Sequence, residues 1–216
     1  MEPIVTVFAQ SPDRGRGLAR DMQVRWALEE VGLRYGVRCV TFAEMRGRVH
    51  LARNPFGQIP AYEQEGLVLF ESGAIVLHIA ERHAGLLPGD ADARSRAKMW
   101  MFAALSTIEP VIVERSMLIL TEEDEEWFAP RLALVDARIR KRLADLATHL
   151  GSSDWLEKDF SAGDLMMVGV LRRLGESDLL ADEPRIAAYV ARGEARPAFQ
   201  RAFAAQLELF KSSSGE

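Results

Sequence analysis

The chain has 216 residues, of which 48% are hydrophobic and 27% charged, a composition typical of a soluble globular protein. Its formal charge of −5 gives no electrostatic basis for nucleic-acid binding, and no apolar run is long enough to predict a membrane span. One cysteine, Cys39, and four scattered histidines exclude an internal disulfide and give no metal-ligand spacing, so without a secretion signal we expect a cytoplasmic, metal-free protein.

The first part of the chain mixes strand and helix signals. The expected elements, in chain order, are a strand at 4–8, a helix at 21–30, a strand at 35–42, a hairpin of strands at 61–63 and 67–70, and a helix at 72–83. The order β-α-β followed by β-β-α indicates an α/β unit with one crossover. Because such crossovers are right-handed, a thioredoxin-like sheet is the simplest topology.

After residue 90 the strand signals almost vanish. The expected helices are a long one at 94–120 kinked at Pro110, an amphipathic one ending near Leu150, one beginning at Ser161 and a last one at 197–210. Glycine and proline cluster at 85–92 between the two parts. We therefore predict an α/β domain at 1–84, a linker at 85–92 and an all-α domain at 93–216.

The first of three local motifs is NPFGQIP at 54–60, where a proline precedes the first strand of the hairpin. Such a proline cannot donate to the strand ladder. If the Ile59–Pro60 bond is cis, the N–H and C=O of Ile59 face outward and can pair with an extended peptide. The alternative is a plain turn that leads into a strand, because most X–Pro bonds are trans.

The second motif is Glu71-Ser72 at the start of the helix at 72–83. Ser72 is a good N-cap residue, and the N–H groups of a helix start bind anions. Glu71 adds a carboxylate for an ammonium group, so the pair suits the amine and carboxylate of an α-amino acid. The alternative is an ordinary cap beside a solvated glutamate.

The third motif is FSAGDL at 160–165. Ser161 and Asp164 have the S-x-x-D spacing of a reciprocal helix cap, and Phe160 and Leu165 occupy the positions of a hydrophobic staple. This motif predicts a structural helix start without substrate contact.

Together, NPFGQIPAY, ESGAI beginning eleven residues after Pro60, and SAGD in the helical part resemble the cytosolic glutathione transferase superfamily. The likeness covers essentially the whole chain and is greatest to phi-like and theta-like branches and bacterial relatives. It implies a homodimer of the glutathione transferase fold that takes glutathione as co-substrate and conjugates its thiolate to a small apolar electrophile.

The resemblance also implies residue roles. Ile59, before a cis Pro60, would pair through its main chain with the cysteinyl part of glutathione. Glu71 and Ser72 would hold the γ-glutamyl amine and carboxylate, and Gln58 would reach glutathione from the turn. The glycyl carboxylate would meet one of three basic side chains: Arg46, Arg48 or His50.

The resemblance assigns the catalytic hydroxyl to Ser11, after the first strand. However, twelve residues separate Ser11 from Val24, more than in the family. This insert either leaves Ser11 at the sulfur, displaces it, or brings Arg14 or Arg16 there; the structural alternative for Ser11 is a turn residue. Cys39 lies within the second strand, where we expect core packing rather than a nucleophile.

One serine hydroxyl is sufficient in magnitude for this chemistry. Lowering a thiol pKa from about 8.5 by about two units needs about 2.7 kcal/mol, and a hydrogen bond to a charged acceptor contributes about 1.5–3 kcal/mol. The electrophile would bind in an apolar pocket of the helical half, or these side chains simply pack in the core: Met101, Phe102, Leu105 and Met117.

Two other functions fit the same fold. One is a glutathione-dependent isomerase, reductive lyase or peroxidase. The other is a non-catalytic glutathione-binding or protein-interaction module, since a fold alone does not fix a function.

Overall fold

A computed structural model describes residues 1–175 and 177–214 of the chain. Their contacts form two compact units, and each is considered by itself. Unit 1 comprises residues 1–87 and 195–216, and unit 2 comprises residues 88–194.

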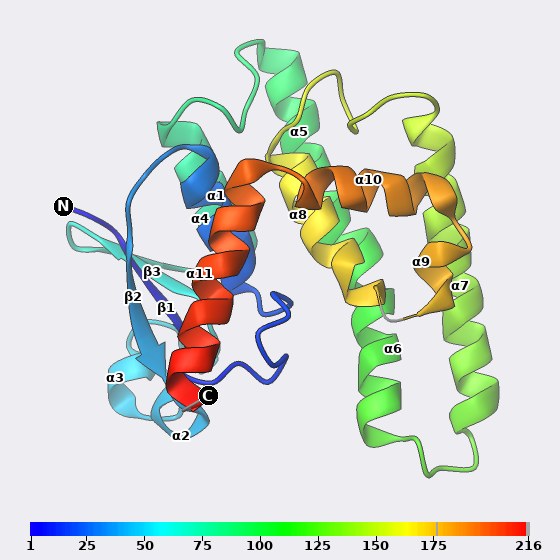
Figure 1. Ribbon diagram of the computed structural model, residues 1–216, viewed down its shortest axis with the longest axis horizontal. Coiled ribbons are helices and arrows are strands. Elements are labelled where there is room, and N and C mark those ends of the chain that lie inside the picture. Colours follow the sequence, from blue (N-terminus) through cyan, green and yellow to red (C-terminus); the bar gives the residue numbers. More distant parts are fainter. Residues whose placement is uncertain (176, 215–216) are drawn as a thin grey trace. The chain divides into compact units, whose positions relative to one another are not determined.

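Unit 1 is built on a mixed four-stranded sheet, as the sequence predicts (Figure 1). The strand order is β2-β1-β3-β4, with β1 parallel to β2 and antiparallel to β3, and β3 antiparallel to β4. This is a thioredoxin-like domain. Its elements are β1 (Ile4–Phe8), α1 (Asp21–Glu30), β2 (Gly36–Val40), α2 (Phe42–Met45), α3 (Arg48–Leu51), β3 (Ala61–Gln64), β4 (Leu67–Phe70), α4 (Ser72–Arg82) and α11 (Pro197–Ser214).

Helix α1 lies at the centre of unit 1 and packs against both α4 and α11 (Figure 1). Every residue of α1 from Asp21 to Leu28 is buried. Two ion pairs fix the start of α11 to the end of α1: Arg196 contacts Glu30 at 2.5 and 2.8 Å, and Arg201 contacts Glu29 at 2.7 Å. Helix α11 therefore belongs to unit 1 by its contacts. The predicted boundaries at 84 and 93 stay a prediction, and this grouping differs from them in the last helix.

Unit 2 consists of helices (Figure 1). Where the sequence predicts a kink at Pro110, the helix passes through a π-helical turn, and Pro110 lies in the first turn of the next helix. A proline is tolerated there because the N–H groups of a first turn have no partner within the helix. The elements are α5 (Ala91–Ala103), η1 (Ala104–Ile108), α6 (Glu109–Thr121), α7 (Phe128–Leu150), α8 (Ala162–Leu171), η2 (Arg172–Leu174), α9 (Asp178–Ala181) and α10 (Pro184–Glu194).

Helix α8 is the buried centre of unit 2, and the SAGD motif fixes its start. The Asp164 carboxylate accepts hydrogen bonds from the N–H of Ser161 at 2.9 Å and the N–H of Leu156 at 2.9 Å. The Tyr189 hydroxyl donates to it at 3.0 Å. Burial raises the pKa of Asp164, although these hydrogen bonds oppose the shift. Burial beside this carboxylate also holds the pKa of Tyr189 well above its usual value.

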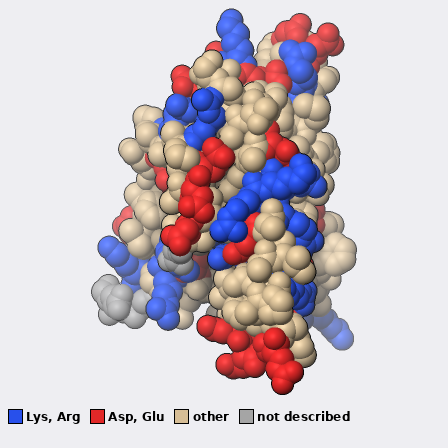
Figure 2. All heavy atoms as spheres, turned by 90° about the vertical axis from the view of Figure 1, so that its right-hand side faces the viewer, with Lys and Arg blue, Asp and Glu red and all other residues tan. Residues whose placement is uncertain are grey.

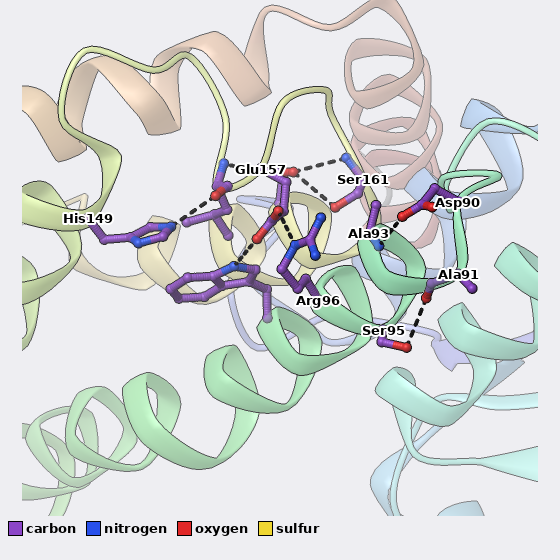
Figure 3. A network of polar contacts seen from close by, with 11 residues as sticks. Asp90, Ala91, Ala93, Ser95, Arg96, His149, Glu157 and Ser161 are labelled. Atoms are coloured by element: carbon purple, nitrogen blue, oxygen red, sulfur yellow. Dashed lines mark hydrogen bonds and ion pairs between the residues drawn. The ribbon is translucent and has the colours of Figure 1, made fainter.

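A second polar cluster lies next to this cap (Figure 3). Glu157 accepts from Arg96 Nε at 2.8 Å and from Trp100 Nε1 at 3.1 Å, which connects the 151–160 loop to α5 (Figure 3). His149 Nε2 donates to the Leu156 carbonyl at 2.9 Å. These contacts join the motif and the loop into one structural support.

The surface of unit 2 carries an acidic cluster. Figure 2 shows Asp and Glu side chains gathered at the lower end of the view, where the connection between α6 and α7 lies. This connection holds the run EEDEE at 122–126, which precedes α7 rather than forming its first turn. In the described part of the chain, no helix combines the length and apolarity needed to cross a bilayer.

Candidate functional site

Three segments of unit 1 meet at one end of the sheet. Because β1 and β4 run antiparallel to β3, the carboxyl ends of β1 and β4 lie at the same end of the sheet as the amino end of β3. Ser11 follows β1, Ile59 and Pro60 precede β3, and Glu71 and Ser72 follow β4. The topology therefore places the sequence-predicted glutathione-contacting residues at one end of the sheet.

The hairpin register makes this placement specific. Ala61 pairs with Phe70, so Pro60 and Glu71, each one residue beyond this pair, lie across from each other. The Ile59–Pro60 peptide bond is cis. The Ile59 side chain is 8% exposed and packs in a small apolar cluster. Among the described residues, no turn or loop hydrogen bond uses the Ile59 N–H or C=O.

Glu71 has an unusual backbone conformation. Its φ of 68° lies in the left-handed region, which is rare for a residue with a side chain. Residues held in such conformations cluster at ligand-binding and catalytic sites. Its side chain is exposed and makes no cap hydrogen bond. The prediction that Ser72 caps α4 is wrong by one residue, because the left-handed turn at Glu71 makes that residue the cap and Ser72 the first helical residue.

The Ser72 hydroxyl is buried without a protein partner. Ser72 is 2% exposed, and within the described ranges its Oγ has no hydrogen-bond partner. Buried hydroxyls are nearly always hydrogen-bonded, because leaving one unpaired is costly. Together with the N–H groups of the first turn of α4, this hydroxyl forms a site suited to a carboxylate.

Two buried side chains hold the turn before Ile59 by hydrogen bonds. The Gln58 side chain is exposed, whereas its carbonyl accepts from His50 Nε2 at 2.8 Å and Asn54 Nδ2 at 3.0 Å. His50 is 3% exposed, so its side chain supports the turn and does not face a ligand. Of the basic candidates for a glycyl carboxylate, Arg46 and Arg48 remain, and both are exposed.

Ser11 lines a small, partly open cavity beneath α11. It is 9% exposed, and its Oγ has no hydrogen-bond partner in residues 1–175 and 177–214. The cavity, of about 10 Å³, is also lined by Asp21, Arg25, Gln206 and Phe210. Arg25 Nε and Asp21 Oδ2 form a buried ion pair at 2.8 Å. Burial raises the pKa of Asp21, and Arg25 opposes this shift.

The segment after Ser11 is an ordered loop organised by Asp13, a role that sequence reasoning missed. The Asp13 carboxylate accepts from the N–H groups of Gly15 at 3.1 Å, Leu18 at 2.5 Å and Ala19 at 3.0 Å. Local bonding of this kind is typical of aspartate in turns, so the run SPDRGRG carried the signal. Gly15 has a φ of 74°, and a Cβ there would lie 3.0 Å from Leu207 of α11.

Arg14 and Arg16 belong to the same loop. Both are exposed, and Arg16 Nε donates to the Asp13 carbonyl at 2.9 Å. The expectation that Cys39 fills the core is wrong: Cys39 is exposed on β2, the strand at one edge of the sheet, beside β1.

The four predicted pocket residues differ in exposure. Met101 is buried in the core of unit 2, and Leu105 in the π-helical turn is half-buried. Phe102 and Met117 are 64% and 47% exposed. Core packing therefore accounts for Met101, whereas Phe102 and Met117 present apolar surface.

Comparison with known proteins agrees with this geometry. Residues 14–81 match the model of the glutathione S-transferase N-terminal domain. Glutathione S-transferase 4 of Zea mays is 30% identical over 189 residues, which cover 80% of this chain and 82% of the relative. The chain belongs to the glutathione S-transferase family. The predicted family and fold are thus confirmed, while its place in a phi- or theta-like branch stays a prediction.

Solved transferases share the fold. Glutathione transferase F7 from Populus trichocarpa superposes with a TM-score of 0.81 at 23% identity, covering 95% of this chain and 99% of that one. A glutathione transferase from Burkholderia graminis, solved with two glutathione molecules bound per subunit, gives 0.80 at 24% identity, covering 94% and 87%.

Proposed function

We propose that this transferase-family chain binds glutathione at this end of the sheet and conjugates its thiolate to a small apolar electrophile. One observation carries the binding proposal: the buried, unpartnered Ser72 hydroxyl lies at a helix start next to the left-handed Glu71. The glutathione bound to the Burkholderia graminis relative supports the same ligand class.

In this proposal Ser72 turns its buried hydroxyl toward the γ-glutamyl carboxylate, which accepts from Ser72 Oγ and from N–H groups at the start of α4. The exposed Glu71 carboxylate faces the γ-glutamyl ammonium. The unpaired N–H and C=O of Ile59, beside the cis Pro60, bind the cysteinyl unit, and the Gln58 side chain reaches it from the turn. These contacts match the ammonium and carboxylate of the γ-glutamyl unit and the main chain of the cysteinyl unit.

Ser11 is the proposed donor to the thiolate, because its hydroxyl has no partner in the described part of the chain. A donor to sulfur has to reach it, and this Oγ is enclosed by α11 side chains. Catalysis through Ser11 therefore requires a new Ser11 rotamer or a displacement of the Gln206–Phe210 part of α11. Arg14, exposed on the adjacent loop, is the alternative cation for the thiolate.

The electrophile site and the assembly are also proposals. The exposed Phe102 and Met117 and the half-buried Leu105 supply apolar surface for the electrophile, whereas Met101 is buried. A homodimer in the cytoplasm follows from family resemblance, and the 70% exposed Phe56 is apolar surface that a second copy would cover. Gel filtration with light scattering measures the mass directly.

A second function is glutathione binding without conjugation. The enclosed Ser11 hydroxyl favours it, because the binding groups at Ile59 and Ser72 do not depend on Ser11. Isomerase, lyase or peroxidase chemistry would need the same accessible thiolate.

Two measurements separate these functions. Calorimetry with reduced glutathione tests binding, and the conjugation rate with a generic aryl halide tests transfer. Binding with turnover supports the transferase. Binding without turnover supports either glutathione binding without catalysis or an isomerase, lyase or peroxidase. No heat at millimolar glutathione would contradict all of these functions.

A further inference from the structure

The turn before Ile59 is fixed by two buried side chains that do not face the ligand site. His50, in α3, and Asn54, three residues after α3, are each 3% exposed. Their Nε2 and Nδ2 atoms lie 2.8 and 3.0 Å from the Gln58 carbonyl oxygen. A carbonyl oxygen only accepts hydrogen bonds, so both nitrogens donate and the proton of His50 is inferred to be on Nε2. The carbonyl is thus held from two directions.

The rest of the turn leaves this peptide little freedom. Asn54 Oδ1 accepts from the Phe56 N–H at 3.0 Å, and the Asn54 carbonyl accepts from the Gly57 N–H at 3.0 Å. Gly57 has a φ of 63°, and a Cβ there would lie 3.1 Å from the Met45 carbonyl oxygen. One asparagine therefore ties both sides of the turn together.

Fixing the direction of the Gln58 carbonyl also fixes the direction of the Ile59 N–H. The carbonyl of one residue and the N–H of the next belong to the same planar peptide unit, and in a trans unit they point in opposite directions. The Gln58–Ile59 bond is not among the cis bonds of the described chain. Because the Gln58 carbonyl points inward to His50 and Asn54, the Ile59 N–H points away from them.

We propose that His50 and Asn54 are positioning residues that aim the Ile59 N–H at the cysteinyl carbonyl of glutathione. The inference rests on the proposed glutathione binding and names residues that act through the peptide unit without touching the ligand. It also explains why a basic residue close to the site is buried.

The main test compares four variants by calorimetry with reduced glutathione. His50→Leu removes the donor, and His50→Gln restores an N–H donor on a flexible side chain. Asn54→Asp keeps an acceptor for the Phe56 N–H but replaces the Nδ2 donor with an oxygen that faces the Gln58 carbonyl. Val49→Ala, at a 74% exposed position of α3, is the matched control.

We expect His50→Leu and Asn54→Asp to raise the Kd for glutathione about tenfold, as the loss of one well-aimed hydrogen bond would. His50→Gln should recover most of the affinity, and Val49→Ala should match the parent. In conjugation assays the loss should appear in KM for glutathione, with kcat at saturating glutathione nearly unchanged. A general structural defect would lower kcat as well and would not be rescued by glutamine.

Hydrogen exchange of residues 54–58 provides a test independent of glutathione. His50→Leu and Asn54→Asp should accelerate exchange of the Gly57 N–H, and His50→Gln should do so much less. If the parent binds no glutathione, the proposed function fails while exchange still tests whether the two side chains hold the turn. Parent-like exchange in both variants would overturn the inference, as would faster exchange with an unchanged Kd. If His50→Leu fails to fold by circular dichroism, a parent-like Kd for Asn54→Asp overturns it alone.

Discussion

Replacing Ser72 by alanine is expected to stabilise the free protein and to weaken glutathione binding. The opposite signs follow from a single feature, the buried Oγ without a protein partner at the start of α4. A hydroxyl kept only for packing would give loss of stability and no change in binding. A gain in stability together with a loss of glutathione affinity therefore distinguishes a ligand-binding serine from a structural one.

The magnitudes follow from the same feature. A buried polar group without a partner costs about 1–3 kcal/mol, so its removal should raise the free energy of unfolding by up to this amount. For a chain of this length, 1 kcal/mol corresponds to a shift in Tm of about 2–4 °C. In the complex, a hydrogen bond to a carboxylate contributes about 1.5–3 kcal/mol, so the Kd should rise by about 10- to 150-fold.

Thermal unfolding with and without glutathione, together with calorimetry, measures both effects. Ser95→Ala is the matched control, because Ser95 is exposed on α5 and its Oγ donates to the Ala91 carbonyl at 2.9 Å (Figure 3). It should leave the Kd unchanged. A Ser72→Ala protein that melts earlier without ligand and binds glutathione with the parent Kd would refute the assignment.

Three further predictions concern other parts of the molecule. Ser11→Ala should lower kcat for aryl-halide conjugation by more than it raises the Kd for glutathione; equal activity would remove Ser11 from catalysis. Asp13→Ala should lower the free energy of unfolding in urea by about 1–3 kcal/mol, because three buried or partly buried N–H groups lose their acceptor. Burial raises the pKa of Tyr189, so its stabilising contribution is complete below the unfolded pKa of about 10 and is lost above it. Chemical denaturation across this range should show a smaller alkaline loss for Tyr189→Phe than for the parent.

Local sequence signals are sufficient to predict most of the strands and helices of unit 1. The strands and helices around 4–8, 21–30 and 61–83 have clear patterns and turn residues, and the right-handed crossover then fixes the sheet order. Helix α10 was missed although its signal is local: Pro184 begins it, and Ile186, Tyr189 and Val190 form its buried face.

Other features depend on contacts distant in sequence. The pattern of β2 did not distinguish an edge strand from a central one, so Cys39 was assigned to the core although it is exposed. Similarly, Ser11 is covered by Gln206, which is 195 positions away in the chain. His50 looked like an available base because a sequence does not show which way a short helix turns its side chains.

In the proposed function, glutathione binding and catalysis depend on different parts of this structure. The positions of Ile59 and Ser72 follow from the register of one hairpin, in which Ala61 pairs with Phe70, and the direction of the Ile59 N–H depends in addition on His50 and Asn54. The position of Ser11 depends instead on an Asp13-centred loop and on α11, which packs against Gly15 of that loop. Changes in the loop or in α11 are therefore expected to alter thiolate chemistry while leaving glutathione binding intact, whereas substitutions of His50 or Asn54 are expected to weaken binding with kcat nearly unchanged.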